Sequence, residues 1–198
     1  MSKFFLVFTL FFVSLSALEQ SENIASSYLK SYNYEQAGNY KDAIKTLLPL
    51  YRNFPKGYTL NLRLGWLFYL NKKYNNAIEH YKKASLSNTS SMEAKLGLIR
   101  VYLASYGYEK AQNLSTELLK IDYYNYYANL YISQALIAQK KYKISIKITQ
   151  KMLTLYPTDI VFLQELYIAY KKTNNRYTQE IYKSIMILDP NNTLIKSL

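Results

Sequence analysis

The apolar positions of this 198-residue chain follow a helical period in several separate segments. Between Leu64 and Phe68, for example, apolar side chains recur three and four positions apart, which places them on one face of a helix. Only 5 Gly and 4 Pro are present, too few for the frequent turns of a β-sandwich. The pattern predicts an all-α chain with first helices at residues 24–37, 58–71, 92–105 and 126–139. Each is followed by a second, antiparallel helix that opens near Asn39, Lys73, Tyr108 or Lys141.

The second helices share a tyrosine followed three positions later by a small residue. The tyrosines recur at 34-residue steps and are Tyr40, Tyr74, Tyr108 and Tyr142. The small residues keep the same step and are Ala43, Ala77, Ala111 and Ser145. A small side chain lets the two helices of a hairpin approach closely, and a tyrosine ring fills the space between neighbouring helices. A fixed period of this length is typical of a helical repeat array.

The repeat resembles that of the tetratricopeptide repeat family over roughly residues 24–190. The second repeat carries the family's large and small positions in order, at Leu64, Gly65, Phe68, Tyr74, Ala77, Tyr81 and Ala84. Trp66 departs from the pattern, because it follows Gly65 instead of preceding it by four residues. The resemblance implies a right-handed α-solenoid of about five stacked hairpins. Their expected bounds are 24–57, 58–91, 92–125, 126–159 and 160–190. In the fifth, Tyr177 is one residue off register, and we interpret this hairpin as a terminal cap.

The N-terminus has the parts of a secretory signal. Lys3 precedes an apolar run from Phe4 to Val13, and small residues follow up to Ala17. This run is too short to span a bilayer as a helix. We therefore expect residues 1–17 to be a signal peptide and residues 18–198 to be a periplasmic or secreted repeat domain. Retention of the segment as an anchor is the alternative. Lipoprotein attachment is excluded because the chain has no cysteine.

The side chains needed for catalysis are scarce. Without cysteine the chain has no thiolate nucleophile, disulfide or thiolate metal site, and His80 is the single histidine. We expect His80 to be packed or solvated on a second helix, without a catalytic partner. The carboxylates are scattered, and no glycine-rich phosphate loop is present. The sequence therefore predicts a protein that is not an enzyme and that needs no cofactor and no metal.

The formal charge of +12 allows a nucleic acid, an anionic membrane surface or an acidic protein as partner. The lysines are dispersed along the chain, which favours a solvated basic surface over a dedicated polyanion groove. Export argues against nucleic acid as the partner. Peripheral association with the cell envelope stays open.

First helices line the concave groove in tetratricopeptide arrays, so the resemblance implies a candidate binding groove. Its aromatic, basic and polar members are Tyr28, Tyr32, Arg63, Trp66, Tyr69, Arg100, Tyr127, Tyr131 and Gln134. Aromatic residues and arginine contribute most of the binding energy at many interfaces. The leading hypothesis is an exported scaffold for protein–protein interaction, in the assembly of the envelope or of secretion machinery. The alternative is a helical repeat protein of the envelope that binds a polyanion or a carbohydrate.

Overall fold

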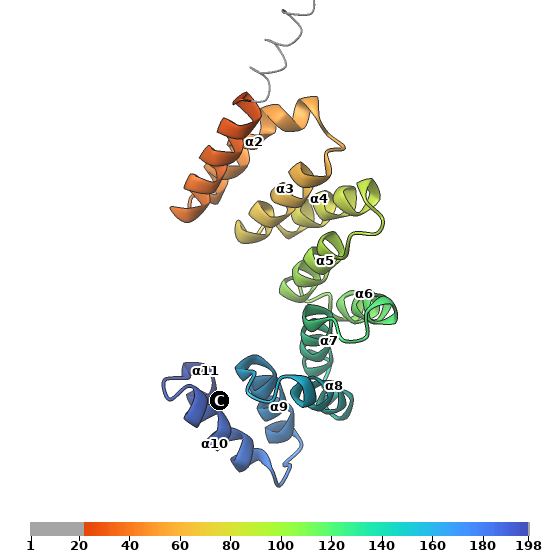
Figure 1. Cartoon of the computed structure of the whole chain (residues 1–198), viewed down its shortest axis with the longest axis vertical. Helices are drawn as coiled ribbons and strands as arrows, with labels where there is room; N and C mark the ends of the chain where they lie inside the picture. Colours follow the sequence, from red (N-terminus) through yellow and green to blue (C-terminus); the bar gives the residue numbers. More distant parts are fainter. Residues whose placement is uncertain (1–21, 198) are drawn as a thin grey trace, which may run out of the picture. The chain divides into compact units, whose positions relative to one another are not determined.

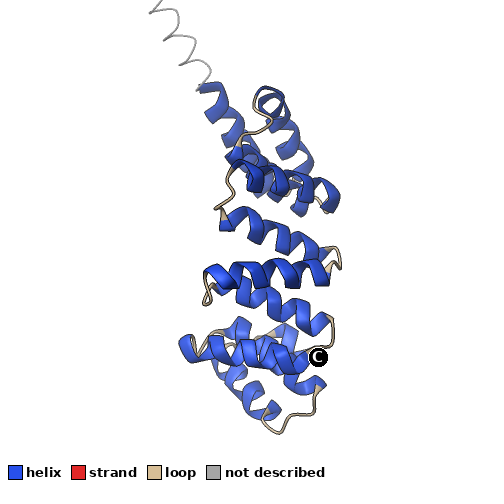
Figure 2. Ribbon diagram, turned by 90° about the vertical axis from the view of Figure 1, so that its right-hand side faces the viewer, coloured by secondary structure: helices blue, strands red, loops and turns tan. Residues whose placement is uncertain are grey.

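The computed structural model describes residues 22–197, apart from the side chain of residue 194. The expected signal segment, residues 1–17, lies outside this range. Within residues 22–197 every regular element is a helix, and there is no strand (Figure 2). None of these helices is long and apolar enough to cross a membrane.

The helices form consecutive antiparallel pairs (Figure 1). The first pair consists of a helix described over residues 22–36 and α2 (Tyr40–Asn53). The following pairs are α3 (Tyr58–Leu70) with α4 (Tyr74–Ser87), α5 (Met92–Ala104) with α6 (Tyr108–Ile121), α7 (Tyr126–Ala138) with α8 (Tyr142–Leu155), and α9 (Ile160–Lys172) with α10 (Thr178–Leu188). A short helix, α11 (Thr193–Lys196), follows the fifth pair. These hairpins confirm the all-α repeat fold that the sequence predicts.

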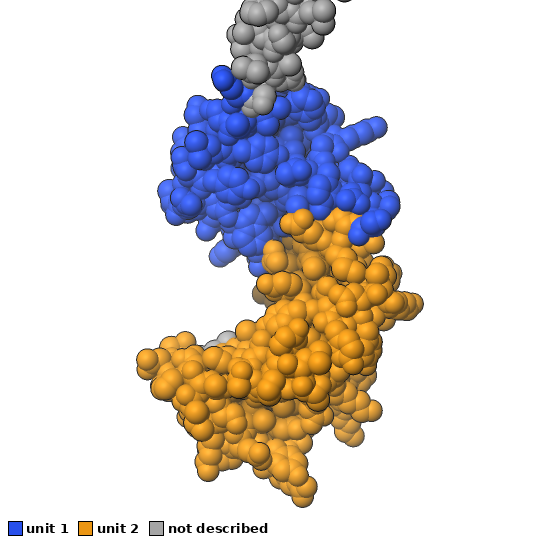
Figure 3. Space-filling view, viewed as in Figure 1, with its two compact units in different colours: residues 1–90 blue, residues 91–198 orange. Residues whose placement is uncertain are grey.

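Two compact units divide the chain, residues 1–90 and 91–198, and Figure 3 colours them separately. The first unit contains the first two hairpins, with an apolar core built around Leu47, Leu64 and Leu67. The second unit contains the other three, with one core cluster around Ile99, Leu118 and Phe162 and another around Tyr167 and Ile185.

The tyrosines and small residues that recur every 34 positions occupy equivalent places in four hairpins. Each tyrosine is the first residue of its second helix, at the start of α2, α4, α6 and α8. The small residue three positions later has no solvent exposure in any of them. Ser145 replaces alanine in the fourth hairpin, and its hydroxyl lies 2.8 Å from that of Ser133 on the facing helix. The buried hydroxyl therefore has a hydrogen-bond partner, and the close helix approach is kept.

The turns inside the hairpins repeat as strictly as the helices. One residue in each turn has a positive φ, and these residues are Gly38, Lys72, Tyr106, Lys140 and Asn174, again 34 residues apart. In every turn this residue and the next donate their backbone N–H groups back to the end of the first helix, as Lys72 does to Tyr69 and Lys73 to Phe68. This is the Schellman ending of a helix, which favours glycine at the left-handed position. Only the first turn has glycine, Gly38, at this position.

The fifth hairpin departs from the pattern just after this turn. The left-handed residue, Asn174, keeps the 34-residue step, but α10 begins four residues later, at Thr178, instead of two. Tyr177, which the sequence places one residue off register, is the N-cap of α10 and not its first residue. The turn at residues 189–192 does not end the fold, because α11 follows it and Ile195 packs into the core with 2% of its surface exposed.

Candidate functional site

A depression of about 500 Å³ lies on the first unit between the helix at residues 22–36 and α3. It is lined by Tyr32, Glu35, Gln36, Tyr40, Arg63, Trp66 and Leu70, and we call it the aromatic depression. Three of the nine residues expected in the groove, namely Tyr32, Arg63 and Trp66, are thus brought together. A fourth, Tyr69, stacks on Trp66 with 5.5 Å between ring centroids.

The charged groups of the aromatic depression are paired with each other. Arg63, which is 8% exposed, forms an ion pair with Glu35 and donates to the hydroxyl of Ser31 at 3.2 Å. The Trp66 indole donates to the other carboxylate oxygen of Glu35 at 2.6 Å. Two hairpins are tied together in this way, since Ser31 and Glu35 belong to the first and Arg63 and Trp66 to the second.

The Arg63 guanidinium also packs over the aromatic ring of Tyr32. Its guanidinium carbon lies 3.8 Å from the centroid of the Tyr32 ring, a cation–π geometry. Tyr32 remains 49% exposed, so one part of its surface covers the guanidinium and another is open to solvent. With the charge of Arg63 balanced by Glu35, the surface offered to a partner is aromatic and polar and not strongly basic.

Tyr28 faces the interior of the first unit more than it faces the aromatic depression. It is half-buried and packs against the core of the first unit. Burial raises the pKa of its hydroxyl above the ordinary value, with a smaller contribution from Tyr32. A buried phenol of this kind serves packing more readily than contact with a partner.

In the second unit three of the expected groove residues take part in two hydrogen-bonded pairs. The Arg100 Nε donates to the Tyr131 hydroxyl at 3.0 Å, and the Gln134 amide donates to Glu165 at 3.1 Å. Tyr131 is 7% exposed, whereas Tyr127 is 52% exposed and lies at 6.0 Å from it, centroid to centroid. Burial raises the pKa of Glu165 to about 7, and the hydrogen bond from Gln134 opposes this rise.

Three of these hydrogen bonds share the same spacing along the sequence. The bonds of Glu35 to Trp66, Arg100 to Tyr131 and Gln134 to Glu165 each join residues 31 positions apart, on first helices of neighbouring hairpins. Four of these six residues belong to the groove expected from the sequence, and Glu35 and Glu165 do not. The lining residues Gln36, Tyr40 and Leu70 were also not expected there. The 31-residue spacing was the signal that could have found Glu35.

His80 lies in a packed site on α4. It is 6% exposed, with its ring stacked on Phe68 at 5.2 Å and edge-on to Tyr51 at 5.0 Å. Its Nδ1 is 2.9 Å from the amide oxygen of Asn61, and the amide nitrogen of Asn61 donates to two backbone carbonyls. Burial, and then the charge of Lys83, lower the pKa of His80 to about 4. This histidine is therefore neutral and structural. Among residues 22–197 no group of His, Asp or Glu side chains could hold a metal ion.

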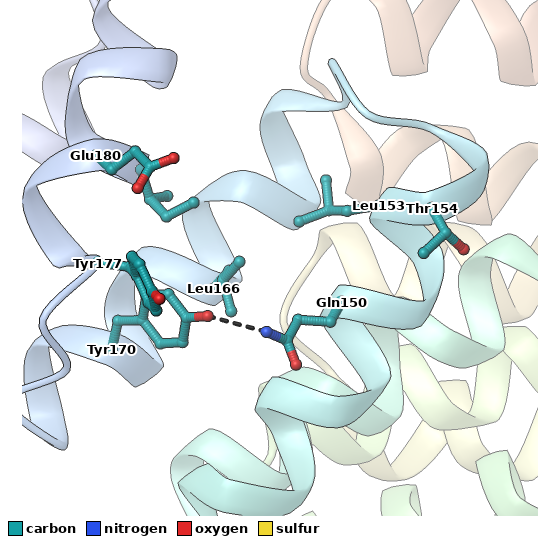
Figure 4. Close-up of a pocket in the computed structure, with 8 residues that line it drawn as sticks. Gln150, Leu153, Thr154, Leu166, Tyr170, Tyr177 and Glu180 are labelled. Carbon is teal, nitrogen blue, oxygen red and sulfur yellow. Dashed lines mark hydrogen bonds between the residues drawn. The ribbon is translucent and has the colours of Figure 1, made fainter.

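The second unit has hollows along the seam between α8 and α10. One of about 360 Å³ is lined by Gln150, Leu153, Thr154, Leu166, Tyr170, Tyr177, Glu180 and Ile181 (Figure 4). Gln150 donates to the Tyr170 hydroxyl across it at 2.9 Å. A second of about 430 Å³ shares Leu153 and Ile181 with the first. Both hollows are lined in part by α10, the helix that begins late.

Comparisons with known proteins agree with the repeat architecture. Residues 28–91 match the family model of the tetratricopeptide repeat. The structure of MamA 41-end from Desulfovibrio magneticus RS-1 is similar, with a TM-score of 0.75 and 16% identity over 86% of this chain and 97% of that chain. A crystal structure of MamA protein has a TM-score of 0.71 and 18% identity over 86% of this chain and 93% of that chain. No curated protein sequence matches the chain. Residues 28–91 therefore match the tetratricopeptide repeat, and the chain as a whole shares its fold with these solved structures.

Proposed function

We propose that this protein is an exported scaffold that binds a protein or peptide partner in its aromatic depression. The observation that carries the proposal is the exposed face of Tyr32, held over the neutralised Arg63–Glu35 pair and beside Trp66. A rigidly held aromatic side chain can bury much apolar area on binding at little cost in conformational entropy. Helical repeats of this kind generally use such faces for partner proteins.

The depression is held in place before any partner arrives. Arg63 and Glu35 use their charged groups on each other and on Ser31, Tyr32 and Trp66, which fixes both hairpins in one arrangement. The side chains left to meet a partner are the open face of Tyr32, the exposed Gln36 and the half-buried Trp66. We therefore assign Arg63 the task of positioning Tyr32, while Tyr32 and Trp66 make the contact.

A photo-crosslinking experiment in the producing cell tests this assignment. Benzoyl-phenylalanine placed at residue 32 should cross-link to a discrete partner protein, whereas the same group at residue 34 should not. Tyr34 is the matched control, since it is 40% exposed, lies two positions away on the same helix and lines no part of the depression. Equal cross-linking from both positions, or none from residue 32, would exclude the depression as the binding site.

Trp66 offers a direct reading of occupancy because it is the only tryptophan in the chain. Binding of the cross-linked partner, once purified, should shift the emission of Trp66 and protect it from acrylamide quenching. The Tyr32→Ala variant should lose the shift and Tyr34→Ala should keep it.

Export through the N-terminal segment is part of the same proposal. Its support is the order of a basic start, an apolar run and small residues over Lys3 to Ala17. Mass spectrometry of the protein from the producing cell should show an N-terminus near Leu18, in the periplasmic or secreted fraction. A cytoplasmic chain that still begins at Met1 would contradict export. A role in envelope or secretion-machinery assembly would follow from the identity of the cross-linked partner.

A further inference from the structure

The outer face of α8 has an unusual charge pattern. Lys143, Lys147 and Lys151 are spaced four residues apart, so they follow one ridge of this 14-residue helix, and α8 has no acidic residue. The ridge rises about 6 Å per lysine. We call these three residues the lysine row. Among the described residues, 22–197, none of these three lysines forms an ion pair with a carboxylate.

A pair of exposed tyrosines stands at the Lys151 end of the row. The Lys151 ammonium is 3.8 Å from the ring centroid of Tyr123 and 5.6 Å from that of Tyr124. It also donates to the Tyr123 carbonyl at 2.9 Å, which fixes the end of the row to the loop before α7. The two rings are edge-to-face at 4.9 Å and are 59% and 52% exposed. Uncompensated cations thus adjoin an open aromatic surface.

We propose that the lysine row and the Tyr123–Tyr124 pair form a docking site for an extended, acidic segment of a protein partner. In an extended chain alternate side chains lie on one side, about 6.6 Å apart. Three carboxylates at alternate positions would therefore match the roughly 6 Å steps of the lysines along α8. An apolar side chain at the end of the segment would then lie against the two tyrosine rings.

The charges on the neighbouring helices favour a single peptide segment over a membrane surface. The second helices on either side of α8 are formally neutral, with two acids and two lysines on α6 and one of each on α10. A flat anionic bilayer would meet the outer helices together, whereas the excess positive charge lies on α8 alone. A narrow chain can follow α8 alone. The site is separate from the aromatic depression, since it lies wholly in the second unit.

Binding measurements with four probes, the peptides being read by fluorescence anisotropy, test the proposal on the full chain. The first probe is a labelled extended peptide with glutamate at three alternate positions and a terminal leucine. The second has glutamine in place of each glutamate. The third is a vesicle of phosphatidylcholine with phosphatidylglycerol, and dextran sulfate serves as a soluble polyanion. We expect the acidic peptide to bind, the glutamine peptide not to bind, and the affinity to fall as salt screens the charges.

Two variants with the same change in net charge identify the surface. Lys143→Gln/Lys147→Gln removes two exposed lysines of the row, and Lys45→Gln/Lys82→Gln removes two exposed lysines of second helices in the first unit. The first should weaken the acidic peptide about 5- to 10-fold and the second less than 2-fold. Tyr123→Ala/Tyr124→Ala should also weaken binding, although it leaves the charge unchanged. Circular dichroism should show that every variant keeps its helices.

Several results would overturn the proposal. Equal weakening by both lysine variants would mean attraction by net charge alone. Equal binding of the glutamine peptide would exclude recognition of carboxylates. Binding of vesicles or dextran sulfate that depends on the lysine row, without binding of the acidic peptide, would assign the row to a membrane or a glycan instead.

Discussion

The ring of Tyr81 lies where a side chain at Gly65 would begin. A Cβ built on Gly65 would be 2.9 Å from the Cδ1 and the Cγ of Tyr81, closer than real Cβ contacts allow. Gly65 is in the middle of α3, and Tyr81, which is 3% exposed, is on α4. The close packing of the second hairpin therefore depends on a missing side chain.

The first prediction concerns this contact. Alanine usually stabilises a helix relative to glycine by about 1 kcal/mol, but here the methyl group would force apart two packed helices. We expect Gly65→Ala to lower the free energy of unfolding by about 1–3 kcal/mol, measured by denaturant unfolding. Adding Tyr81→Leu should reduce that cost, because the smaller side chain leaves room for the methyl group. A gain in stability from Gly65→Ala alone would contradict the clash.

The second prediction concerns the left-handed turn residues. Lys72 and Lys140 have φ values of 56° and 60°, which strain any residue that carries a Cβ. Both side chains are exposed, so their removal costs little packing. We expect Lys72→Gly and Lys140→Gly each to raise the free energy of unfolding by about 0.5–1 kcal/mol. The control, Lys82→Gly in the body of α4, should lower it by about 1 kcal/mol. If all three variants are destabilised alike, the positive φ values are not a source of strain.

The third prediction concerns His80. Burial lowers its pKa from 6.5 to about 4, so between these values the unfolded chain binds a proton that the folded chain does not. Its contribution to stability is complete above pH 6.5 and falls as the pH drops towards 4, by at most about 3 kcal/mol. Since His80 is the only histidine, one imidazole signal in a proton NMR titration reports it. An inflection near pH 6.5 in the folded protein would show that the ring is solvated.

The fourth prediction has the opposite sign. Burial raises the pKa of Glu165 from 4.5 to about 7, so between these values the folded chain keeps a proton that the unfolded chain has lost. Stability from this group is complete below pH 4.5 and falls as the pH rises through 7, by about 3 kcal/mol. Glu165→Gln keeps an acceptor for Gln134 and cannot ionise. We expect this variant to be more stable than the wild type at pH 8 and similar to it at pH 4.5. A constant difference across that range would exclude titration of Glu165.

The helical fold could be predicted because its causes are local and periodic. Ala43 and its equivalents are small because the two helices of one hairpin approach closely at these positions, so the close approach is visible in the sequence itself. The left-handed turns have the same period, but the sequence does not show it, because Lys72, Tyr106 and Lys140 are not residue types that prefer a positive φ. The helices on both sides impose this backbone conformation on them.

The candidate site could be predicted only in part. Aromatic and basic residue types on first helices indicated Tyr32, Arg63 and Trp66, and the aromatic depression contains all three. The burial of Arg63 could not be foreseen, since it depends on Glu35 of the preceding hairpin, whose acidic side chain alone indicates a solvated surface. The late start of α10 depends on the two residues added after Asn174, which no 34-residue comparison places.

The constant turn has a consequence for how such a chain can change length. Between Lys72 and Tyr106, or between Tyr106 and Lys140, the chain runs through one whole period and returns to the same backbone conformation. A gene duplication or deletion with both ends at these residues would rejoin a turn identical in shape to the original. Growth and shortening of the array are thus compatible with its geometry at these junctions, whereas a break near Asn174 would carry the longer fifth turn with it.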